Sequence, residues 1–443
     1  MEWDQLLSSL RFGDKDYPEQ PHRPTYVQDA DRIVFSAPFR RLANKTQVHP
    51  LYSHDHIHHR LIHSAETASA GRSLGMAVGH WLEESGEIAS GDRHKLAGMV
   101  HAACLAHDIG NPPFGHSGEE AIGDWFSTKF TDPKGIFAQV DHSLRAEFEK
   151  FEGNAQGFRI LTRLEMYRGE GGMRLSNGVL GAFTKYPVTA NVQVNCDVKY
   201  CGLKKFGVFG SEADNFAAVA ERLGLLRETT GQGNWWRRHP LVFLVEAADD
   251  ICYNIVDAED GFAAGDLGFD EVKKCLEPLG GKSNKDLSSY TEHEEIAYLR
   301  AKSIGAAIEA CVDAFKENYT DIMTGQFSGS LVEVSSKKAE FAAIRKVAED
   351  QLFTAPRKTK LEVRGRNVLH TVLDGLSPVY QKLSENSWSE SDLPNYERQL
   401  IRTVDLDLRD VTDAYTALHS LTDFVSGMTD RYALEVASMV SGT

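Results

Sequence analysis

Histidine and aspartate side chains recur at three places where the neighbouring residues are apolar or small. His63 stands in a run of small residues, His107 and Asp108 are adjacent at the end of an apolar stretch, and Asp249 lies in a strongly apolar segment. Two imidazoles and two carboxylates supply the N and O ligands that suit a borderline-to-hard divalent ion. Such an ion polarises a phosphoryl oxygen and lowers the pKa of bound water, so this set predicts metal-dependent hydrolysis of a phosphoester.

Two more groups of catalytic type follow the His-Asp pair within the segment 101–122, HAACLAHDIGNPPFGHSGEEAI. Small apolar residues at helical spacing predict a buried helix that ends near Asp108, because the glycine and prolines of GNPP do not continue a helix. A second helix is expected to begin at Ser117, with acidic residues in its first turn. His116 and Glu119 would then place an imidazole beside a reacting phosphorus and a carboxylate to orient it.

The same residues also have a purely structural interpretation. A buried histidine is more often a hydrogen-bonded core residue than a ligand, and a His-Asp pair taken alone is common. The order of the set favours a metal site, because a histidine, a His-Asp pair before a helix break and an aspartate in an apolar helix occur together in one chain.

An apolar helix is needed to position the last aspartate. The segment 239–262, HPLVFLVEAADDICYNIVDAEDGF, predicts a helix that stops near Gly261. Asp249, Tyr253 and Asp257 recur at four-residue spacing, so they lie above one another on one face. A helix this apolar is buried, and buried carboxylates are paired, protonated or metal-bound.

Three further segments complete the candidate site. LIHSAETASAGRSLG (61–75) predicts a helix around His63, and its small residues allow another helix to approach closely. The stretches 169–187 and 201–212 are rich in glycine and lysine, and they are candidate anion-binding loops.

The remaining pattern predicts a mostly α protein with at most a few short strands. Residues 1–30 are polar and indicate an irregular lead-in, and alternation of apolar residues suggests strands only at 188–195 and 328–336. Neither an internal repeat nor a long linker divides the chain. We therefore expect a single unit with its catalytic core at about 31–262 and additional helices over 263–443.

Composition narrows the classes of function. The 443 residues include 48 Lys and Arg against 64 Asp and Glu, and the net charge of −16 argues against a generally basic nucleic-acid surface. An anionic substrate would need a local basic pocket. The six cysteines lack CxxC pairing, which favours free thiols in a reducing compartment. No signal-peptide pattern and no apolar run of 18 residues is present, so we expect a cytoplasmic protein without a membrane span.

The order H…HD…D resembles that of HD-domain metal phosphohydrolases. Longer motifs between about Asp31 and Leu434 are similar to those of bacterial deoxyguanosine triphosphate triphosphohydrolases. This resemblance implies a mostly helical HD fold, a homo-hexamer, and hydrolysis of a dNTP at the α-phosphorus to deoxynucleoside and triphosphate. The motifs are FRRLANKTQV, RLIHSAETASAGR, HDIGNPPFGHSGE, FEGNAQGFRIL, TKYP, EAADDICYNIVDAEDG and GMTDRYAL.

The resemblance also implies residue roles. In physical terms, Tyr253 would stack on the 2-deoxyribose and exclude a 2′-hydroxyl, while Asp257 accepts a hydrogen bond from the 3′-hydroxyl. Arg60 and Lys185 would offset triphosphate charge. The ion would be Mn²⁺ or Mg²⁺ first, with Fe, Co, Ni or Zn as alternatives. The implied metal ligands are His63, His107, Asp108 and Asp249; the catalytic pair is His116 and Glu119; the substrate-binding residues are Gln47, Arg60, Asn154, Lys185, Tyr186, Lys205, Tyr253 and Asp257.

Two other functions are compatible with these residues. One is an HD hydrolase of another phosphoester, such as a nucleoside monophosphate, a cyclic dinucleotide or a guanosine alarmone. The other is a sensor that binds dNTP or single-stranded DNA and turns over little, although the composition gives no basic stripe with interleaved aromatic residues. The sequence leaves open whether a second dNTP acts as an activator, and Gln47 alone does not fix the choice of base.

Overall fold

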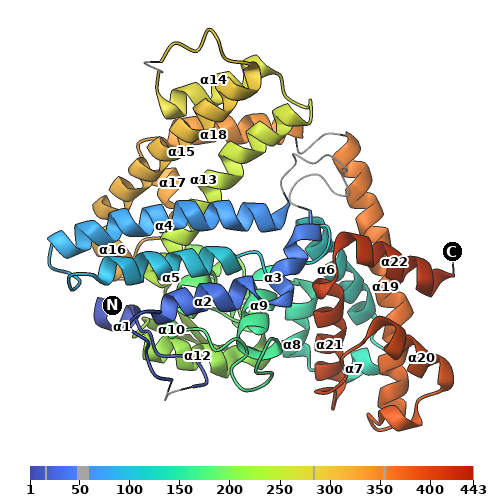
Figure 1. Ribbon diagram of the computed structural model, residues 1–443. Helices are drawn as coiled ribbons and strands as arrows, with labels where there is room; N and C mark the ends of the chain where they lie inside the picture. Colours follow the sequence, from blue (N-terminus) through green and yellow to red (C-terminus); the bar gives the residue numbers. More distant parts are fainter. Residues whose placement is uncertain (15–16, 47–58, 283–284, 353–355, 443) are drawn as a thin grey trace.

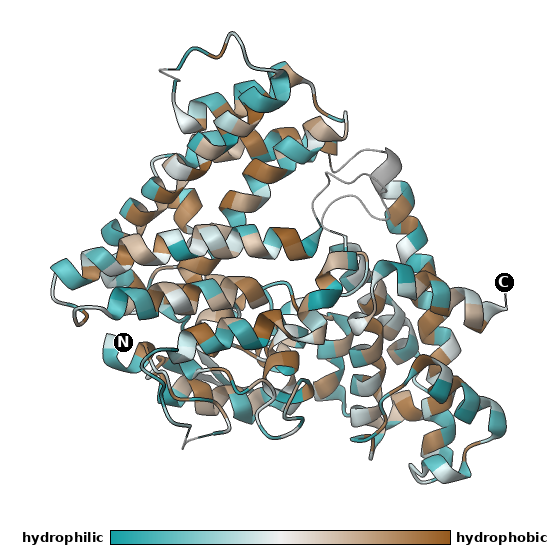
Figure 2. Cartoon of the chain, viewed as in Figure 1, coloured by the Kyte–Doolittle hydropathy of each residue, from teal (hydrophilic) through white to brown (hydrophobic). Residues whose placement is uncertain are grey.

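The computed structural model describes residues 1–14, 17–46, 59–282, 285–352 and 356–442. These residues are mostly helical, which confirms the predicted fold class (Figure 1). Many helices show apolar and polar residues on different sides, the pattern of amphipathic helices that cover a core (Figure 2). Within the described part of the chain, no helix is both long and apolar enough to cross a membrane.

The first half of the chain contains three longer helices, α4, α5 and α6, among shorter ones. Its helices are α1 (Trp3–Leu6), α2 (Thr25–Val34), α3 (Ala37–Arg41), α4 (Arg60–Glu84), α5 (Asp92–Ala106), α6 (His116–Thr131), α7 (Ile136–Gln139), α8 (His142–Glu149), α9 (Gly153–Arg159), α10 (Asn177–Phe183), α11 (Ala190–Val194) and α12 (Ala213–Arg222). Short 3-10 turns are η1 (Leu42–Asn44), η3 (Cys201–Leu203) and η4 (Gly210–Glu212), and η2 (Ile160–Leu164) is a π-helical turn.

The second half is helical after one small hairpin. Strands β1 (Arg227–Thr230) and β2 (Gly233–Trp236) pair antiparallel, with Arg227 opposite Trp236. The helices are α13 (Pro240–Ala263), α14 (Phe269–Gly280), α15 (Glu292–Glu317), α16 (Tyr319–Met323), α17 (Leu331–Val334), α18 (Lys338–Val347), α19 (Pro356–Glu385), α20 (Asn395–Val404), α21 (Ala414–Gly427) and α22 (Asp430–Ser441), with a π-helical turn η5 (Ala348–Leu352) and a 3-10 turn η6 (Glu390–Asp392).

Three local predictions were wrong. The segments 188–195 and 328–336 contain the helices α11 and α17 instead of strands. In α17 the Ser330 side chain accepts a hydrogen bond from the backbone N–H of Glu333, a helix cap that outweighs the short alternation. The polar lead-in is also structured, because α1 and α2 lie within it and Trp3 is buried in the core.

Glycine residues let α4 and α5 approach closely, as the small residues predicted. Gly71, Gly75 and Gly79 lie four residues apart and face α5. A Cβ added to Gly75 would lie 2.8 Å from the Cα atom of Ala97, and one added to Gly71 would lie 2.5 Å from the Sγ atom of Cys104. The contact brings the N-terminal turn of α4, which carries His63, toward the C-terminal end of α5.

Helix α13 packs against both α4 and α5 and extends beyond them toward α14 and α15 (Figure 1). It begins at Pro240, where the Nδ1 atom of His239 accepts a hydrogen bond from the N–H of Leu241. The predicted stop at Gly261 was wrong, since α13 continues to Ala263. A Cβ at Gly261 would lie 2.8 Å from a methyl group of Leu352, so close packing explains that glycine.

The GNPP turn separates α5 from α6 as expected. Its glycine, Gly110, is needed for close approach, because a Cβ there would lie 2.1 Å from the carbonyl oxygen of Gly153. Helix α6 begins at His116, one residue earlier than predicted. The preceding Gly115 has φ +59°, a conformation that favours glycine.

Candidate metal centre and phosphate pocket

Three side chains from three helices meet at one point. One ligand atom from each of His63 (α4), His107 (the residue after α5) and Asp249 (α13) lies within 4.8 Å of the other two. The Nε2 atom of His63 is 3.0 Å from Oδ1 of Asp249, and the Nε2 atom of His107 is 3.5 Å from the same oxygen. The close contact of α4, α5 and α13 therefore brings together side chains that are far apart in sequence, since His107 precedes Asp249 by 142 residues and His63 precedes it by 186.

The imidazole of His107 is oriented like a metal ligand. Its Nδ1 atom donates to the carbonyl oxygen of Cys104 at 2.7 Å, which fixes the tautomer and leaves Nε2 as the electron-pair donor. That Nε2 atom is buried and has no hydrogen-bond partner among the described residues. A buried polar nitrogen aimed at two carboxylates fits a divalent ion as its missing partner.

Asp108 lies beside this group of three and is held by two neighbours. Its Oδ2 atom accepts a hydrogen bond from Arg60 at 2.6 Å, and its Oδ1 atom accepts one from Asn111. The Oδ1 atom is also 3.6 Å from Nε2 of His107. Burial by itself would raise the pKa of Asp108, but the Arg60 guanidinium and the nearby imidazoles lower it to about 2. Asp108 is therefore a carboxylate at neutral pH.

The electrostatics of Asp249 lead to the same conclusion. Burial would raise its pKa, but the imidazoles of His107 and His63 and the ammonium of Lys185 hold it well below its usual range. Burial alone would lower the pKa of His63, but the hydrogen bond and the charge of Asp249 outweigh that effect. The net result is a raised pKa for His63. Two carboxylates and two imidazoles thus offer a donor set suited to a divalent cation.

A pocket opens on one side of the metal ligands. Its wall includes His107, Asp108 and Asp249, the predicted catalytic pair and four of the eight residues that were predicted to bind substrate. The predicted residues that line it are His116, Glu119, Asn154, Lys185, Tyr186 and Lys205.

Among the described residues, three that were predicted to bind substrate do not line this pocket. Arg60 is buried and engaged with Asp108. Tyr253 and Asp257 lie one and two turns along α13 from Asp249, and the pKa of Tyr253 is raised by burial and by the nearby carboxylates of Asp257 and Asp249. Gln47 lies outside the described residues.

His116 and Glu119 share the pocket but are not paired. The side chain of His116 is exposed, and no hydrogen bond joins it to Glu119 in the part of the chain that is described. Instead, Oε1 of Glu119 accepts a hydrogen bond from the N–H of Gly153 at 2.7 Å, and its other oxygen is 3.8 Å from Nζ of Lys205. Glu119 is thus fixed by the EGN segment, while His116 faces the open pocket.

Two glutamates that the sequence interpretation missed hold the pocket lysines. Glu246 is 3.2 Å from Nζ of Lys185, and Glu152 is 2.8 Å from Nζ of Lys205. Burial and the neighbouring Glu119 raise the pKa of Glu152 to about 7. Glu246 precedes Asp249 by three residues, so helical spacing on α13 was a signal that placed it on the same face.

This arrangement combines the parts needed for hydrolysis of a phosphoester. N and O ligands for a cation form one wall, two lysines provide positive charge for phosphate oxygens, and an exposed imidazole is available for proton transfer. The basic groups are local, as an anionic substrate requires in a chain with a net charge of −16.

Comparison with known proteins gives a consistent result. The HD-domain family matches residues 60–174. Over the whole chain, this protein is 38% identical to a deoxyguanosinetriphosphate triphosphohydrolase-like protein of Synechocystis and to one of Pseudomonas aeruginosa, each covered over 99% of its length. It is 28% identical to the deoxyguanosinetriphosphate triphosphohydrolase of Yersinia enterocolitica, with 98% of each chain covered.

Proposed function

Because this chain belongs to the family of deoxyguanosinetriphosphate triphosphohydrolase-like proteins, we propose that it hydrolyses dGTP, with the other dNTPs as alternative substrates, at the α-phosphorus. The products are the deoxynucleoside and inorganic triphosphate. The observation that carries the proposal is the meeting of His63, His107 and Asp249 at the wall of a pocket that also presents Lys185 and Lys205.

The ligands of the metal are His63, His107 and Asp249, with Asp108 as the fourth. A divalent ion bound there would supply Lewis-acid polarisation of a phosphoryl oxygen and lower the pKa of a water molecule. Arg60 keeps the Asp108 carboxylate charged and oriented through a 2.6 Å hydrogen bond. The ion is proposed to be Mn²⁺ or Mg²⁺.

The pocket residues have separate tasks in this proposal. Lys185 and Lys205 bind the phosphate oxygens and exchange their glutamate partners for the substrate. A water oxygen bonds to the α-phosphorus as the bond to the 5′ oxygen breaks, and protonated His116 transfers its proton to that leaving oxygen. The water gives up one proton to solvent, and a proton from solvent restores His116. Glu119 fixes the EGN segment against the start of α6 and so shapes the wall beside His116.

The sugar site is proposed to lie further along α13. Tyr253 and Asp257 follow Asp249 on the same face, so a deoxynucleoside bound with its α-phosphate at the metal ligands extends over them. Tyr253 would stack on the deoxyribose and Asp257 would accept a hydrogen bond from the 3′-hydroxyl. Gln47 is proposed as a further contact to the nucleotide.

Product analysis tests the proposal. Purified protein is incubated with Mn²⁺ and each dNTP singly and then in mixtures, and the products are resolved by anion exchange. We expect deoxynucleoside and intact triphosphate from dGTP. Release of orthophosphate or pyrophosphate, or no product from any dNTP by metal-loaded protein, would contradict the proposal. Activity that appears only in mixtures would indicate activation by a second nucleotide.

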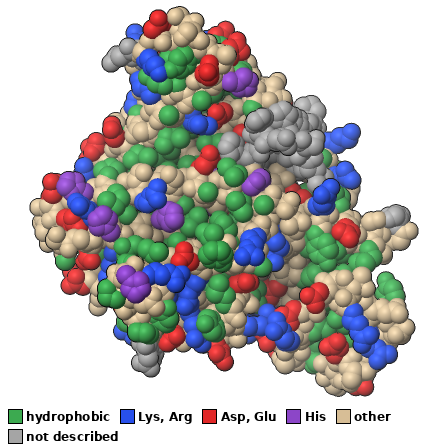
Figure 3. All heavy atoms as spheres, viewed as in Figure 1, with side chains coloured by type: hydrophobic (Ala, Val, Ile, Leu, Met, Phe, Trp, Pro, Cys, Tyr) green, Lys and Arg blue, Asp and Glu red, His purple; other side chains and the backbone are tan. Residues whose placement is uncertain are grey.

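The homo-hexamer, the activating dNTP and the binding of single-stranded DNA stay predictions. On the face shown in Figure 3, acidic and basic side chains are intermixed with apolar ones. A groove that follows a nucleic-acid strand requires clustered positive charge with aromatic side chains. The proposed function therefore rests on the pocket and its ligands.

A further inference from the structure

Asp430, in the GMTDRYAL motif near the C-terminus, contacts the turn that precedes His116 of the candidate site. Asp430, the first residue of α22, is buried and uses both carboxylate oxygens. Its Oδ1 atom accepts a hydrogen bond from the backbone N–H of Phe114 at 3.0 Å. Its Oδ2 atom accepts from the N–H of Thr46 at 3.1 Å and also from the hydroxyl of Thr46. A side chain 316 residues away in sequence thus binds the backbone of the turn that precedes α6.

This turn has an unusual backbone conformation. Phe114 has φ +63° and Gly115 has φ +59°, and His116 follows directly as the first residue of α6. For a residue with a side chain, the left-handed region is unfavourable and persists where the surrounding structure enforces it. The hydrogen bond from Phe114 to Asp430 is one such constraint.

The guanidinium of Arg60 packs closely against Gly115. A Cβ on Gly115 would lie 2.6 Å from a terminal nitrogen of Arg60, whose guanidinium in turn binds Asp108. The turn therefore contacts Asp430 through the N–H of Phe114 and packs closely against Arg60 at Gly115.

Asp430 belongs to a buried cluster of ionisable side chains beside the candidate metal ligands. The Nζ atom of Lys45 donates to the carbonyl oxygens of Asn111 and Ser426 at 2.6 and 2.7 Å. Lys45, Arg60, Asp108 and Asp430 are each 8% exposed or less. Burial lowers the pKa of Lys45 to about 7, although the carboxylates of Asp430 and Asp108 oppose that effect. Removing one charge from such a cluster leaves another uncompensated.

We propose that Asp430 is a positioning residue that sets the place of His116 in the pocket by holding the Phe114–Gly115 turn. It touches neither substrate nor metal ligand, and it acts through the backbone of Phe114. The inference rests on the proposed function, because the role of His116 in proton transfer belongs to that function.

Two measurements on Asp430→Asn test this inference. The amide has a single acceptor oxygen for donors that lie on both sides of the carboxylate, so at least one donor loses its partner. We expect hydrogen–deuterium exchange of the peptide 111–118 to accelerate by about tenfold or more. We also expect kcat for triphosphate release to fall by about 10- to 100-fold, the range found for residues that orient a catalytic group, with KM and bound Mn²⁺ nearly unchanged.

A double mutant separates positioning from general loss of structure. In a His116→Ala background, Asp430→Asn should cause no further loss of kcat, because two residues that act through one group are not additive. Asp413→Asn is the matched control: the same substitution at the N-terminus of α21, where Asn also caps a helix, should change neither measurement. If Asp430→Asn does not fold, Asp430→Glu keeps the charge and displaces the carboxylate, and the same criteria apply.

The outcomes are distinct. Unchanged exchange over 111–118 would overturn the inference, and so would an equal loss of kcat with and without His116. A wild-type protein that releases no triphosphate would contradict the proposed function, and the exchange measurement would still decide whether Asp430 holds the turn.

Discussion

The single residue with the clearest assignment is Asp249. Its Oδ1 atom lies 3.0 Å from His63 and 3.5 Å from His107, so one carboxylate oxygen is shared by both imidazoles. The Nδ1 atom of His107 donates to the carbonyl oxygen of Cys104, and its buried Nε2 atom has no hydrogen-bond partner among the described residues. That Nε2 atom is therefore available to bind a cation. The geometry makes Asp249 the residue whose loss should disrupt the centre most.

Asp249→Ala should abolish metal binding and turnover together. With two imidazoles and Asp108 remaining, we expect bound Mn²⁺ to fall by more than about tenfold and triphosphate release to fall to background. Metal content by mass spectrometry and product release by anion exchange measure the two effects. Asp124→Ala, which removes a mostly exposed carboxylate from α6, should change neither. A variant that kept its metal and its rate would show that the ligand assignment is wrong.

At the scale of elements, the site depends on how closely α4, α5 and α13 pack. His63 and His107 are brought together, with ring centroids 5.2 Å apart, because α4 presents glycines to α5. Asp249 joins them because α13 crosses both helices. Changes that separate these helices should therefore affect stability and the metal centre together.

Gly75→Ala should destabilise the protein although alanine is the better helix former. The added Cβ would lie 2.8 Å from the Cα atom of Ala97, so backbone must shift, at a cost of about 1–3 kcal/mol. Gly305→Ala in α15, where nothing lies within 4 Å of the added Cβ, should instead gain up to about 1 kcal/mol. Urea unfolding measures both free energies. Equal effects of the two substitutions would contradict the close contact of α4 and α5.

His239, which caps α13, should make stability depend on pH. Its Nδ1 atom accepts from Leu241 and its Nε2 atom donates to the carbonyl of Leu6, so the folded protein requires the neutral imidazole. Burial lowers the pKa of His239 to about 4. Since the unfolded value is about 6.5, the unfolded chain binds more protons between these values. The contribution of His239 to stability is therefore complete above pH 6.5 and is lost as the pH falls toward 4.

Urea unfolding at pH 7 and pH 5 checks this expectation. For wild type, His239 should account for a loss of about 2 kcal/mol in the free energy of unfolding between the two pH values. In His239→Asn the pH-dependent loss should be smaller by that amount. His80→Asn, at an exposed position in α4, should leave the wild-type pH dependence intact. If the free energy of unfolding fell by the same amount between pH 7 and pH 5 in His239→Asn and in wild type, His239 would not be the source of the pH dependence.

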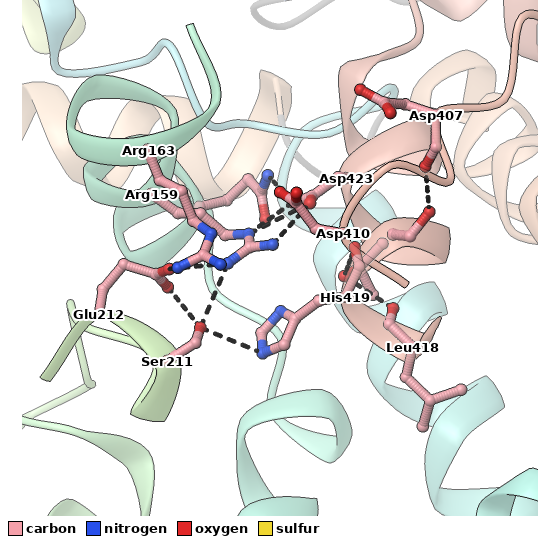
Figure 4. Close-up of polar contacts among 12 residues, drawn as sticks. Arg159, Arg163, Ser211, Glu212, Asp407, Asp410, Leu418, His419 and Asp423 are labelled. Carbon is pink, nitrogen blue, oxygen red and sulfur yellow. Dashed lines mark hydrogen bonds and ion pairs between the residues drawn. The ribbon is translucent and has the colours of Figure 1, made fainter. Parts of the chain in front are cut away.

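At the scale of the whole molecule, the C-terminal helices are joined to the catalytic part by buried ion pairs. Arg159 of α9 donates to Asp423 of α21 through two nitrogens, each at 2.9 Å, and to Glu212 at 2.7 Å (Figure 4). Ser211 donates to the second oxygen of Glu212, and His419 lies beside it. Together with Asp430, these contacts attach α21 and α22 to the segments that form the pocket.

Arg159→Met should destabilise the protein by about 3–5 kcal/mol. The substitution leaves the carboxylates of Glu212 and Asp423 without their buried counter-charge. Arg23→Met removes a surface ion pair with Asp31, in which both side chains are more than a third exposed, and should cost less than about 1 kcal/mol. Chemical unfolding of both variants at neutral pH gives the comparison. A cost for Arg159→Met as small as that for Arg23→Met would contradict the role of this network.

The sequence alone predicted the helical class, which the structure confirms, and it singled out the candidate metal ligands. Both are local or compositional properties: apolar periodicity specifies a buried helix, and a His-Asp pair before GNPP is readable without knowing its neighbours. The close approach of another helix to 61–75 was also predictable, because the small side chains of that segment let two helices pack closely. The short strands were misread because two or three alternating residues fit one turn of a capped helix equally well.

Only the tertiary structure decided which groups support the ligands. Glu152 and Glu246 hold the lysines, Glu119 binds Gly153 instead of His116, and Asp430 holds the turn before α6. None of these pairings follows from sequence spacing, because each joins side chains or backbone groups from segments that meet only when the helices pack. Residue type determines what chemistry a group offers, and the three-dimensional contacts determine which partner it has.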